Sequence, residues 1–228
     1  MDKNLNELLK WSIEAQTNGS GSGSSNTADG PVLPATRSQL TPELLASIMG
    51  GPSDAELMQQ SMAVITSADA AVTLEERLVA FDNFEQLIES LDNANNMGSL
   101  GLWGPLLQTL GHEEPEVRKY AAWCVGTAVQ NNEKTQERLL AAGGLPALVR
   151  MALSGDEKED VRRKAIYALS SATRNYQPAL DVVTAELEKT GHREEGAAKV
   201  DATDMDAVDV VMNGLKEQAK SDANKASA

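Results

Sequence analysis

Cysteine is nearly absent from this sequence of 228 residues, since Cys124 is the only one. A single cysteine excludes an internal disulfide and a cysteine metal cluster, and the two histidines, His112 and His192, lie far apart along the chain. We therefore expect no bound metal and no other cofactor. This cysteine usage fits a reducing compartment and predicts a cytoplasmic protein.

Basic residues are also scarce. Lys and Arg together number 20 against 34 Asp and Glu, which gives a formal net charge of −14. A protein with this charge repels nucleic acid phosphates and anionic lipid surfaces, so neither nucleic acid nor a membrane is an expected partner. No stretch approaches the roughly 18 to 20 apolar residues of a membrane span. The first residues also lack the basic start and apolar centre of a secretory signal.

Aromatic residues make up only 4% of the chain, and no alternating run of β-branched residues lies between turn residues. Three helix-start signals are present instead, a threonine before a proline and two capping boxes: Thr41-Pro42, Ser53 with Glu56, and Thr73 with Glu76. The sequence therefore predicts an all-α fold.

Composition divides the chain into a small amphipathic segment, a linker rich in Gly, Ser and Pro, and a long helical core. The helical core is followed by a loop and a last helix, which we expect to cap the end of the fold. One face of this helix is apolar and consists of Met205, Val208, Val211, Met212 and Leu215. The predicted boundaries are 1–17 for the amphipathic segment, 18–40 for the flexible linker, 41–190 for the core, 191–200 for the loop, 201–220 for the capping helix and 221–228 for a disordered tail.

Comparison of the chain with itself reveals a repeat. Residues 117–131 and 161–175, a shift of 44, are identical at five of fifteen positions and place Trp123 over Tyr167. The preceding helices also superpose, 101–110 on 143–152, at a shift of 41 for their prolines. A helical period of about 40 to 47 residues is typical of armadillo and HEAT repeats.

Residues 132–175 contain three predicted helices, which is the armadillo form. We therefore expect an armadillo-repeat right-handed superhelix of three to four repeats with a flexible N-terminal tail. In the third helix of this repeat one stripe should pack inward: Val161, Ala165, Leu169 and Ala172. A second stripe should line the concave face: Arg163, Tyr167, Ser171 and Arg174 or Asn175, with Lys119, Trp123, Thr127 and Asn131 one repeat earlier.

The polar stretch LDNANN, residues 91–96, follows an apolar helical pattern. Its simplest interpretation is the C-terminal end of that helix, because Asn tolerates the left-handed conformation and its amide can satisfy free carbonyls. Similar stretches, VQNN at 129–132 and TRNY at 173–176, end the next two third helices. Stacked, the three ends would form a row along one edge of the concave face, where a partner could bind.

No motif indicates catalysis. An enzyme would need a nucleophile beside a base, a carboxylate pair in a pocket or a metal set, and the sequence signals none of them. Cys124 lies in the middle of a repeat helix and is expected to be a buried core thiol. Recognition of another protein by a surface is the function class that remains.

Several stretches resemble the armadillo-type nucleotide exchange factors of cytosolic 70-kDa heat-shock chaperones: LLKWSI, GGPSDAELMQQSM, LVAFDNFEQLIESLDNANN, AAWCVGTAVQNN and KAIYALSSATRNYQ. The resemblance implies that the curved stack grips the chaperone's nucleotide-binding domain so that ADP leaves. It also implies that the N-terminal segment competes with client protein for the chaperone's peptide groove, through Leu8, Leu9, Trp11 and Ile13. No covalent chemistry is implied, so we expect a protein that is not an enzyme.

Carried over by position, Ala94 and Arg174 are the expected principal contacts, Ala94 by letting a partner surface come close and Arg174 by donating to a carboxylate or carbonyl. The full expected partner-binding set is Asp92, Asn93, Ala94, Asn95, Asn96, Trp123, Thr127, Asn131, Asn132, Tyr167, Ser171, Arg174 and Asn175. The chain has room for only three to four repeats, fewer than the animal members of the family.

The alternative is an armadillo adaptor that binds basic peptides, as nuclear import receptors do. Those receptors repeat a Trp followed four residues later by Asn. Here Trp123 is followed at that spacing by Thr127 and Tyr167 by Ser171, so the pattern is missing. No feature of the sequence indicates self-association, and we expect a monomer.

Overall fold

The computed structural model describes residues 51–226, with side chains as far as residue 222. The described residues form helices and connecting loops without a strand, in agreement with the predicted all-α fold. The helices are α3 (Asp54–Ile65), α4 (Leu74–Ile88), α5 (Leu91–Asn96), α6 (Trp103–Gln108) continued by the 3₁₀ turn η1 (Thr109–Gly111), α7 (Pro115–Val129), α8 (Glu133–Ala141), α9 (Leu145–Leu153), α10 (Glu159–Thr173), α11 (Gln177–Lys189) and α12 (Met205–Ala226).

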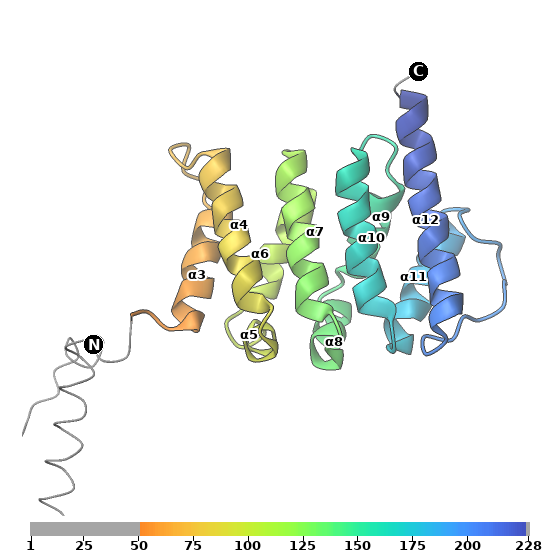
Figure 1. The fold of residues 1–228 in the computed structure, drawn as a ribbon, viewed down its shortest axis with the longest axis horizontal. Helices are drawn as coiled ribbons and strands as arrows, with labels where there is room; N and C mark the ends of the chain where they lie inside the picture. Colours follow the sequence, from red (N-terminus) through yellow and green to blue (C-terminus); the bar gives the residue numbers. More distant parts are fainter. Residues whose placement is uncertain (1–50, 227–228) are drawn as a thin grey trace, which may run out of the picture. The chain divides into compact units, whose positions relative to one another are not determined.

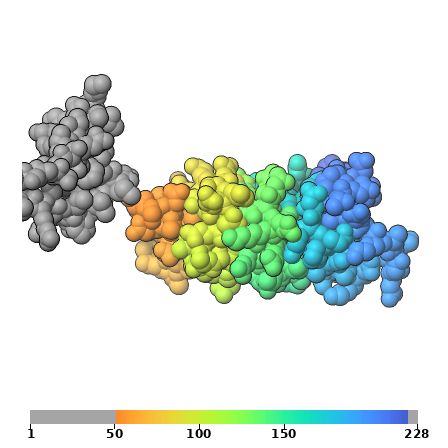
Figure 2. Space-filling model, turned by 90° about the horizontal axis from the view of Figure 1, so that it is seen from below, coloured from red at the N-terminus to blue at the C-terminus, as the bar shows by residue number. Residues whose placement is uncertain are grey.

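The helices repeat in sets of three. A short first helix, a second helix and a long third helix recur as α5, α6 with η1, and α7, and again as α8, α9 and α10. The third helices α7 and α10 lie side by side, with α4 before them and α12 after them in the same row (Figure 1). This is the armadillo-like arrangement that the self-comparison predicts, with α7 matched to α10 and α6 to α9. In the space-filling view the colours follow the order of the sequence along the stack (Figure 2).

Capping boxes begin the first two described helices. The Ser53 hydroxyl accepts a hydrogen bond from the Glu56 amide at 3.3 Å, and the Ser53 amide donates to Glu56 Oε2 at 2.8 Å. Thr73 and Glu76 make the same exchange at the start of α4. Each box satisfies backbone donors that a helix start leaves free, which confirms both predicted helix starts.

One core runs through the described stack. The inward stripe predicted on α10 is buried along its whole length, and Cys124 of α7 is buried as predicted. On α12 the residues Val208, Met212 and Leu215 are buried, while Met205 and Val211 are partly exposed. This apolar face packs on α10 and α9, so α12 covers the last third helix of the stack.

The structure corrects the interpretation of LDNANN. The preceding helix ends at Ile88, Ser90 occupies the N-cap position, and residues 91–96 form α5, the first helix of the next repeat. LDNANN is therefore no counterpart of VQNN and TRNY, which join a third helix to the following first helix. The apolar pattern running into LDNANN hid this break, because Ser90 has no Glu or Gln three residues later to complete a capping box.

The C-terminal helix is longer than predicted. α12 runs to Ala226, so the expectation of a disordered tail from residue 221 is wrong for residues 221–226. Asp222 pairs there with Arg162 of α10, whose side chain is only 1% exposed. The predicted tail is thus held by a buried guanidinium. The predicted segments 1–17 and 18–40, and the helix start at Thr41, lie outside the described residues.

Candidate functional site

The centre of the row of third helices is the close pairing of α7 with α10. Gly126 of α7 lies under the ring of Tyr167, where a Cβ atom would overlap Tyr167 Cε1 and come within 3.1 Å of the Ala168 Cα. Only glycine leaves room for the ring at this point. The Tyr167 hydroxyl donates to Gln130 Oε1 at 3.2 Å. The ring is therefore fixed against α7 on one side and anchored at its tip.

Trp123 lies at the centre of an aromatic and basic cluster on this row. Its ring meets that of Tyr120 edge-on, with the ring centroids 5.6 Å apart. The Lys164 ammonium lies 4.1 Å from the centroid of the Trp123 ring and 5.7 Å from that of Tyr167. A cation over an aromatic face is attracted by the ring quadrupole. Trp123, Lys164 and Tyr167 are all partly exposed, and we call these three residues the Trp–Lys–Tyr cluster.

Two residues of the predicted concave-face stripe, Thr127 and Ser171, are engaged or buried within the stack. Thr127 donates to Glu85 Oε1 of α4 at 2.7 Å, and Glu85 is only 5% exposed. Ser171 is buried. The neighbouring Cys124 thiol has its pKa raised well above the ordinary value, because burial disfavours the thiolate and the charge of Glu85 adds to the effect. A thiol in this state is a packing group and not a nucleophile.

The residues of α5 divide between core and surface. Ala94 is 2% exposed, so its side chain lies in the core and not on the surface where a direct contact was expected. Asn93 donates to Asp54 Oδ2 at 2.8 Å and to the Leu87 carbonyl at 2.9 Å, which ties α5 to α3 and to the end of α4. Asn95 and Asn96 are partly exposed and Asp92 is exposed. Of the three asparagines of LDNANN, Asn93 therefore ties the repeat to its neighbours.

The asparagines that follow α7 and α10 have a backbone role. Asn131 has a φ of 52° and Asn175 a φ of 57°, the left-handed region that Asn tolerates better than most residues. Both are exposed, and the Asn175 amide donates to the Ala202 carbonyl at 2.9 Å. Asn132 is buried at the N-cap position of α8. These residues set the sharp turns between successive repeats.

Arg174 is engaged within the chain. Its guanidinium forms an ion pair with Asp209 of α12 and donates to the Ser170 hydroxyl at 3.1 Å. The side chain of Arg174 is 30% exposed and that of Asp209 is 45% exposed, so the pair lies at the surface. A partner carboxylate would have to compete with Asp209 for this guanidinium.

Two family models match this chain. The first, nucleotide exchange factor Fes1, matches residues 5–97, and the second, the SIL1/FES1/HPBP1 C-terminal domain, matches residues 93–184. The chain is 63% identical over 218 residues to the Hsp70 nucleotide exchange factor FES1 of Gibberella zeae, covering 95% of this chain and 97% of that protein. The chain belongs to the Fes1 family.

Other relatives extend this similarity. The chain is 54% identical to Hsp70 nucleotide exchange factor fes-1 of Neurospora crassa, covering 97% of this chain and all of that protein. The FES1 protein of Yarrowia lipolytica is 42% identical, covering 77% of this chain and 56% of that protein. An engineered protein of known crystal structure has a TM-score of 0.51 at 20% identity, covering 78% of this chain and 71% of that one. This last likeness concerns the fold alone.

The two Fes1 family models divide the structure at α5. The first reaches from outside the described residues through α3, α4 and α5, and the second begins within α5 and ends within α11. The Trp–Lys–Tyr cluster therefore lies in the part that the Fes1 family shares with SIL1 and HPBP1. The whole of α12, which seals the C-terminal end, lies beyond both models.

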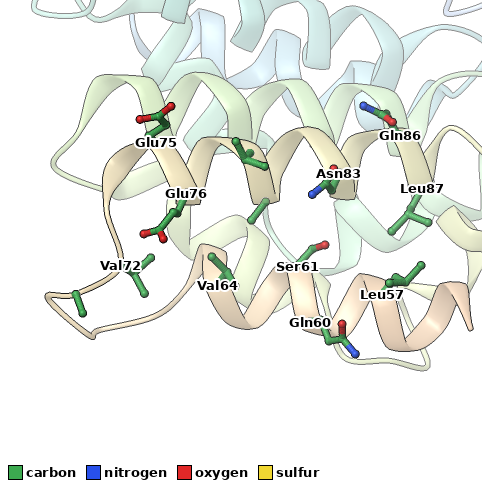
Figure 3. Close-up of a pocket in the computed structure, with 13 residues that line it drawn as sticks. Leu57, Gln60, Ser61, Val64, Val72, Glu75, Glu76, Asn83, Gln86 and Leu87 are labelled. Carbon is green, nitrogen blue, oxygen red and sulfur yellow. The ribbon is translucent and has the colours of Figure 1, made fainter. Parts of the chain in front are cut away.

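The part matched by the first family model contains a groove between α3 and α4 of about 1000 Å³ (Figure 3). Its apolar lining comes from both helices and the loop between them, and includes Leu57, Val64, Val72, Val79 and Leu87. Glu75 and Glu76 lie at the end of the groove marked by Val64 and Val72. No sequence pattern predicts this groove, because it arises from the outer sides of two helices that each look amphipathic in the ordinary way.

Of the expected partner-binding residues, Trp123 and Tyr167 both lie against Lys164, whereas Arg174 pairs with Asp209 of α12. Lys164 was missed. It lies three positions before Tyr167, one helical turn along the same face, and this spacing could have indicated it. In the described part of the chain no group of three or more His, Cys, Asp or Glu could hold a metal, and no helix is long and apolar enough to cross a bilayer.

Proposed function

We propose that this protein is a nucleotide exchange factor for a cytosolic 70-kDa heat-shock chaperone, which it helps to release ADP. One observation carries the proposal: the chain is 63% identical to a protein named Hsp70 nucleotide exchange factor FES1, in an alignment that covers 97% of that protein. A cytoplasmic location follows from this partner. The protein would act as a monomer and would not itself be an enzyme.

A stack of packed helices suits such a role, because nucleotide exchange needs no bond to be made or broken by the exchange factor. The factor must only bind the ADP-loaded chaperone more weakly than the empty one, since any effect on ADP affinity is reciprocal. The close packing of α7 against α10 supports this function. A closely packed surface deforms little on binding, so that the binding energy can change the conformation of the bound domain.

The surface proposed for the chaperone is the row of third helices together with the exposed parts of α5. Its side chains available for contact are Asp92, Asn95, Asn96, Trp123, Asn131, Tyr167 and Asn175. The buried members of the predicted set, Ala94, Asn132 and Ser171, would act by holding this surface in shape. Asn93, Thr127 and Arg174 already have partners within the chain and would contribute through them.

The proposal is tested by the release of fluorescent ADP from a purified cytosolic 70-kDa chaperone. The protein should accelerate release in a saturable manner, and Trp123→Ala should raise the concentration needed for half of the effect. Removing an exposed hot-spot aromatic typically costs about 2 kcal/mol, which is roughly a 30-fold weaker interaction. Unchanged ADP release at saturating protein would contradict the proposal.

The N-terminal segment is proposed to free client protein from the chaperone's peptide groove. Leu8, Leu9, Trp11 and Ile13 give it an apolar pattern around a lysine, and the Gly/Ser-rich linker would keep it near the bound chaperone at high effective concentration. A protein lacking residues 1–17 should accelerate ADP release as the full chain does but should leave a fluorescent peptide bound. Equal peptide release by both proteins would overturn this division of roles.

A further inference from the structure

Lys164 differs from every other cation on α7 and α10 in the described structure. Each of the others has a carboxylate within 4.0 Å: Arg118 pairs with Glu157, Lys119 with Glu116 and Asp160, Arg162 with Asp222, and Arg163 with Glu159. Within the described residues Lys164 has no ion pair and no hydrogen bond from its ammonium. Other cations of the described stack, such as Lys134 and Arg150, also have no ion pair, so what distinguishes Lys164 is its place over the Trp123 ring.

The Lys164 ammonium lies against aromatic rings that attract its charge but do not satisfy its N–H donors. The face of Trp123 lies 4.1 Å from the ammonium nitrogen, and Tyr167 lies 5.7 Å away. An aromatic face attracts the charge but accepts no strong hydrogen bond from the three N–H donors. Partial burial lowers the pKa of Lys164, against an opposing attraction from Glu85. The ammonium is therefore partly stripped of water without a carboxylate to replace that water.

The cluster is also fixed in advance. Gly126 allows the Tyr167 ring to lie on α7, the Tyr167 hydroxyl is bonded to Gln130, and Tyr120 packs edge-on against Trp123. A side chain that is already ordered loses less entropy when a partner binds. The cluster has the features of a binding hot spot: aromatic residues, a partly desolvated charge and a rigid base.

We propose that Lys164 is a binding site for a carboxylate of the chaperone's nucleotide-binding domain, with Trp123 and Tyr167 supporting the ammonium from the protein side. This inference rests on the proposed function and adds to it the chemistry of one contact. An acidic side chain would otherwise be repelled by so acidic a protein. The Trp–Lys–Tyr cluster offers it a local positive site, and the repulsion elsewhere would fix the orientation of the complex.

The test measures binding of the full-length protein to the ADP-free nucleotide-binding domain by calorimetry, alongside ADP release. Lys164→Met keeps the length of the side chain and removes its charge. Because truncating one partner of a partly desolvated charge pair increases dissociation, we expect binding to weaken about 10- to 100-fold. Lys164→Arg should retain most of the affinity, and Lys164→Glu should weaken binding more than Lys164→Met does.

Lys189→Met is the matched control. It removes the same charge from α11, where the Lys189 side chain is 68% exposed and pairs with Glu186. We expect its affinity to stay within about twofold of the original, because exposed rim charges contribute little. The melting temperature should be the same in all four variants, so that weaker binding reports on the contact and not on the fold.

A charge reversal identifies the partner group. Lys164→Glu should regain affinity when one acidic residue of the nucleotide-binding domain is changed to lysine, and only when that residue is the one facing position 164. Lys164→Met binding as tightly as the original protein would overturn the inference while leaving the proposed function intact. If the original protein does not accelerate ADP release, the proposed function itself has failed.

Discussion

The two ends of the described stack have different surfaces. At the C-terminal end, α12 buries Val208, Met212 and Leu215 and turns polar residues outward, with Val210 as the exposed exception at 73%. At the other end, α3 and α4 leave a groove lined by apolar side chains, and Val79 is 55% exposed. Terminal repeats of a solenoid need a polar outer face. α12 thus has the surface of a terminal layer, and α3 with α4 has that of an internal one.

Buried ion pairing adds to this difference. Arg162 is almost inaccessible and donates from Nε to the Ala152 carbonyl at 2.9 Å, while both of its terminal nitrogens reach Asp222 of α12. This pair ties the C-terminal helix to α10 and α9. At the N-terminal end of the described residues, Asn93 ties α5 to the first residue of α3 through a solvent-exposed hydrogen bond between side chains. The C-terminal end should therefore be the more strongly coupled of the two.

Met212→Ala should have the largest effect on stability. Met212 is fully buried between α12 and the rest of the stack, and truncating such a side chain loses burial and leaves a cavity, which costs about 2 to 5 kcal/mol. Val210→Ala on the same helix is the control and should change the free energy of unfolding by less than about 0.5 kcal/mol. Urea unfolding followed by circular dichroism measures both. Similar effects of the two changes would show that α12 does not seal this end.

Arg162→Ala should come next. It removes a buried guanidinium and leaves Asp222 and the Ala152 carbonyl without it, which should cost about 3 kcal/mol since Asp222 keeps some access to water. Hydrogen exchange should show that the last turns of α12 lose protection before α10 does. If α12 keeps its full protection in this variant, the ion pair is not what holds the helix end.

Val79→Ser in the full-length protein should have a small effect. Val79 is 55% exposed, so the substitution should change the free energy of unfolding by about 0.5 kcal/mol or less. The same urea unfolding experiment measures it. A loss above about 2 kcal/mol would contradict the open groove and would mean that Val79 is covered in the whole chain.

Glu76→Gln should have the smallest effect, a slight loss of stability near neutral pH that disappears in acid. The amide and hydroxyl of Thr73 donate to the Glu76 carboxylate and hold its pKa below the ordinary value of 4.5. A lowered folded pKa gives stability that is complete well above pH 4.5 and is lost as the pH falls through the folded pKa. The free energy of unfolding, measured with urea, should therefore decrease less steeply between about pH 6 and about pH 3 in the variant. An identical slope in both proteins would contradict this contribution.

Residues close in sequence could be interpreted correctly. The capping boxes at Ser53 and Thr73 need only residues three apart, and both are present. The match of 117–131 to 161–175 identified two third helices, because burial of one face imposes a period that the sequence itself displays. The interpretation of LDNANN was wrong, because Ser90 and Asn93 do not form the capping-box pattern that would have indicated a new helix start.

Contacts between residues distant in sequence could not be predicted. Arg174 was expected to face a partner, but its guanidinium is paired with Asp209, which lies 35 positions later in the sequence. Arg162 and Asp222 are separated by 60 positions, and a tail of small and polar residues gave no sign that it continued a helix. The packing of several helices decides which cations form an ion pair with a carboxylate. Lys164 was overlooked for that reason.

The sequence by itself determined the helical class, the repeat period and the buried stripes of this protein, because these follow from side-chain spacing within single helices. The tertiary structure decided which polar residues support the fold and which remain available on the surface. Each of those outcomes depends on a partner brought near only when the repeats stack. Ala94 was assigned to the core in this way, Arg174 was paired with Asp209, and Lys164 was left over Trp123 without a carboxylate.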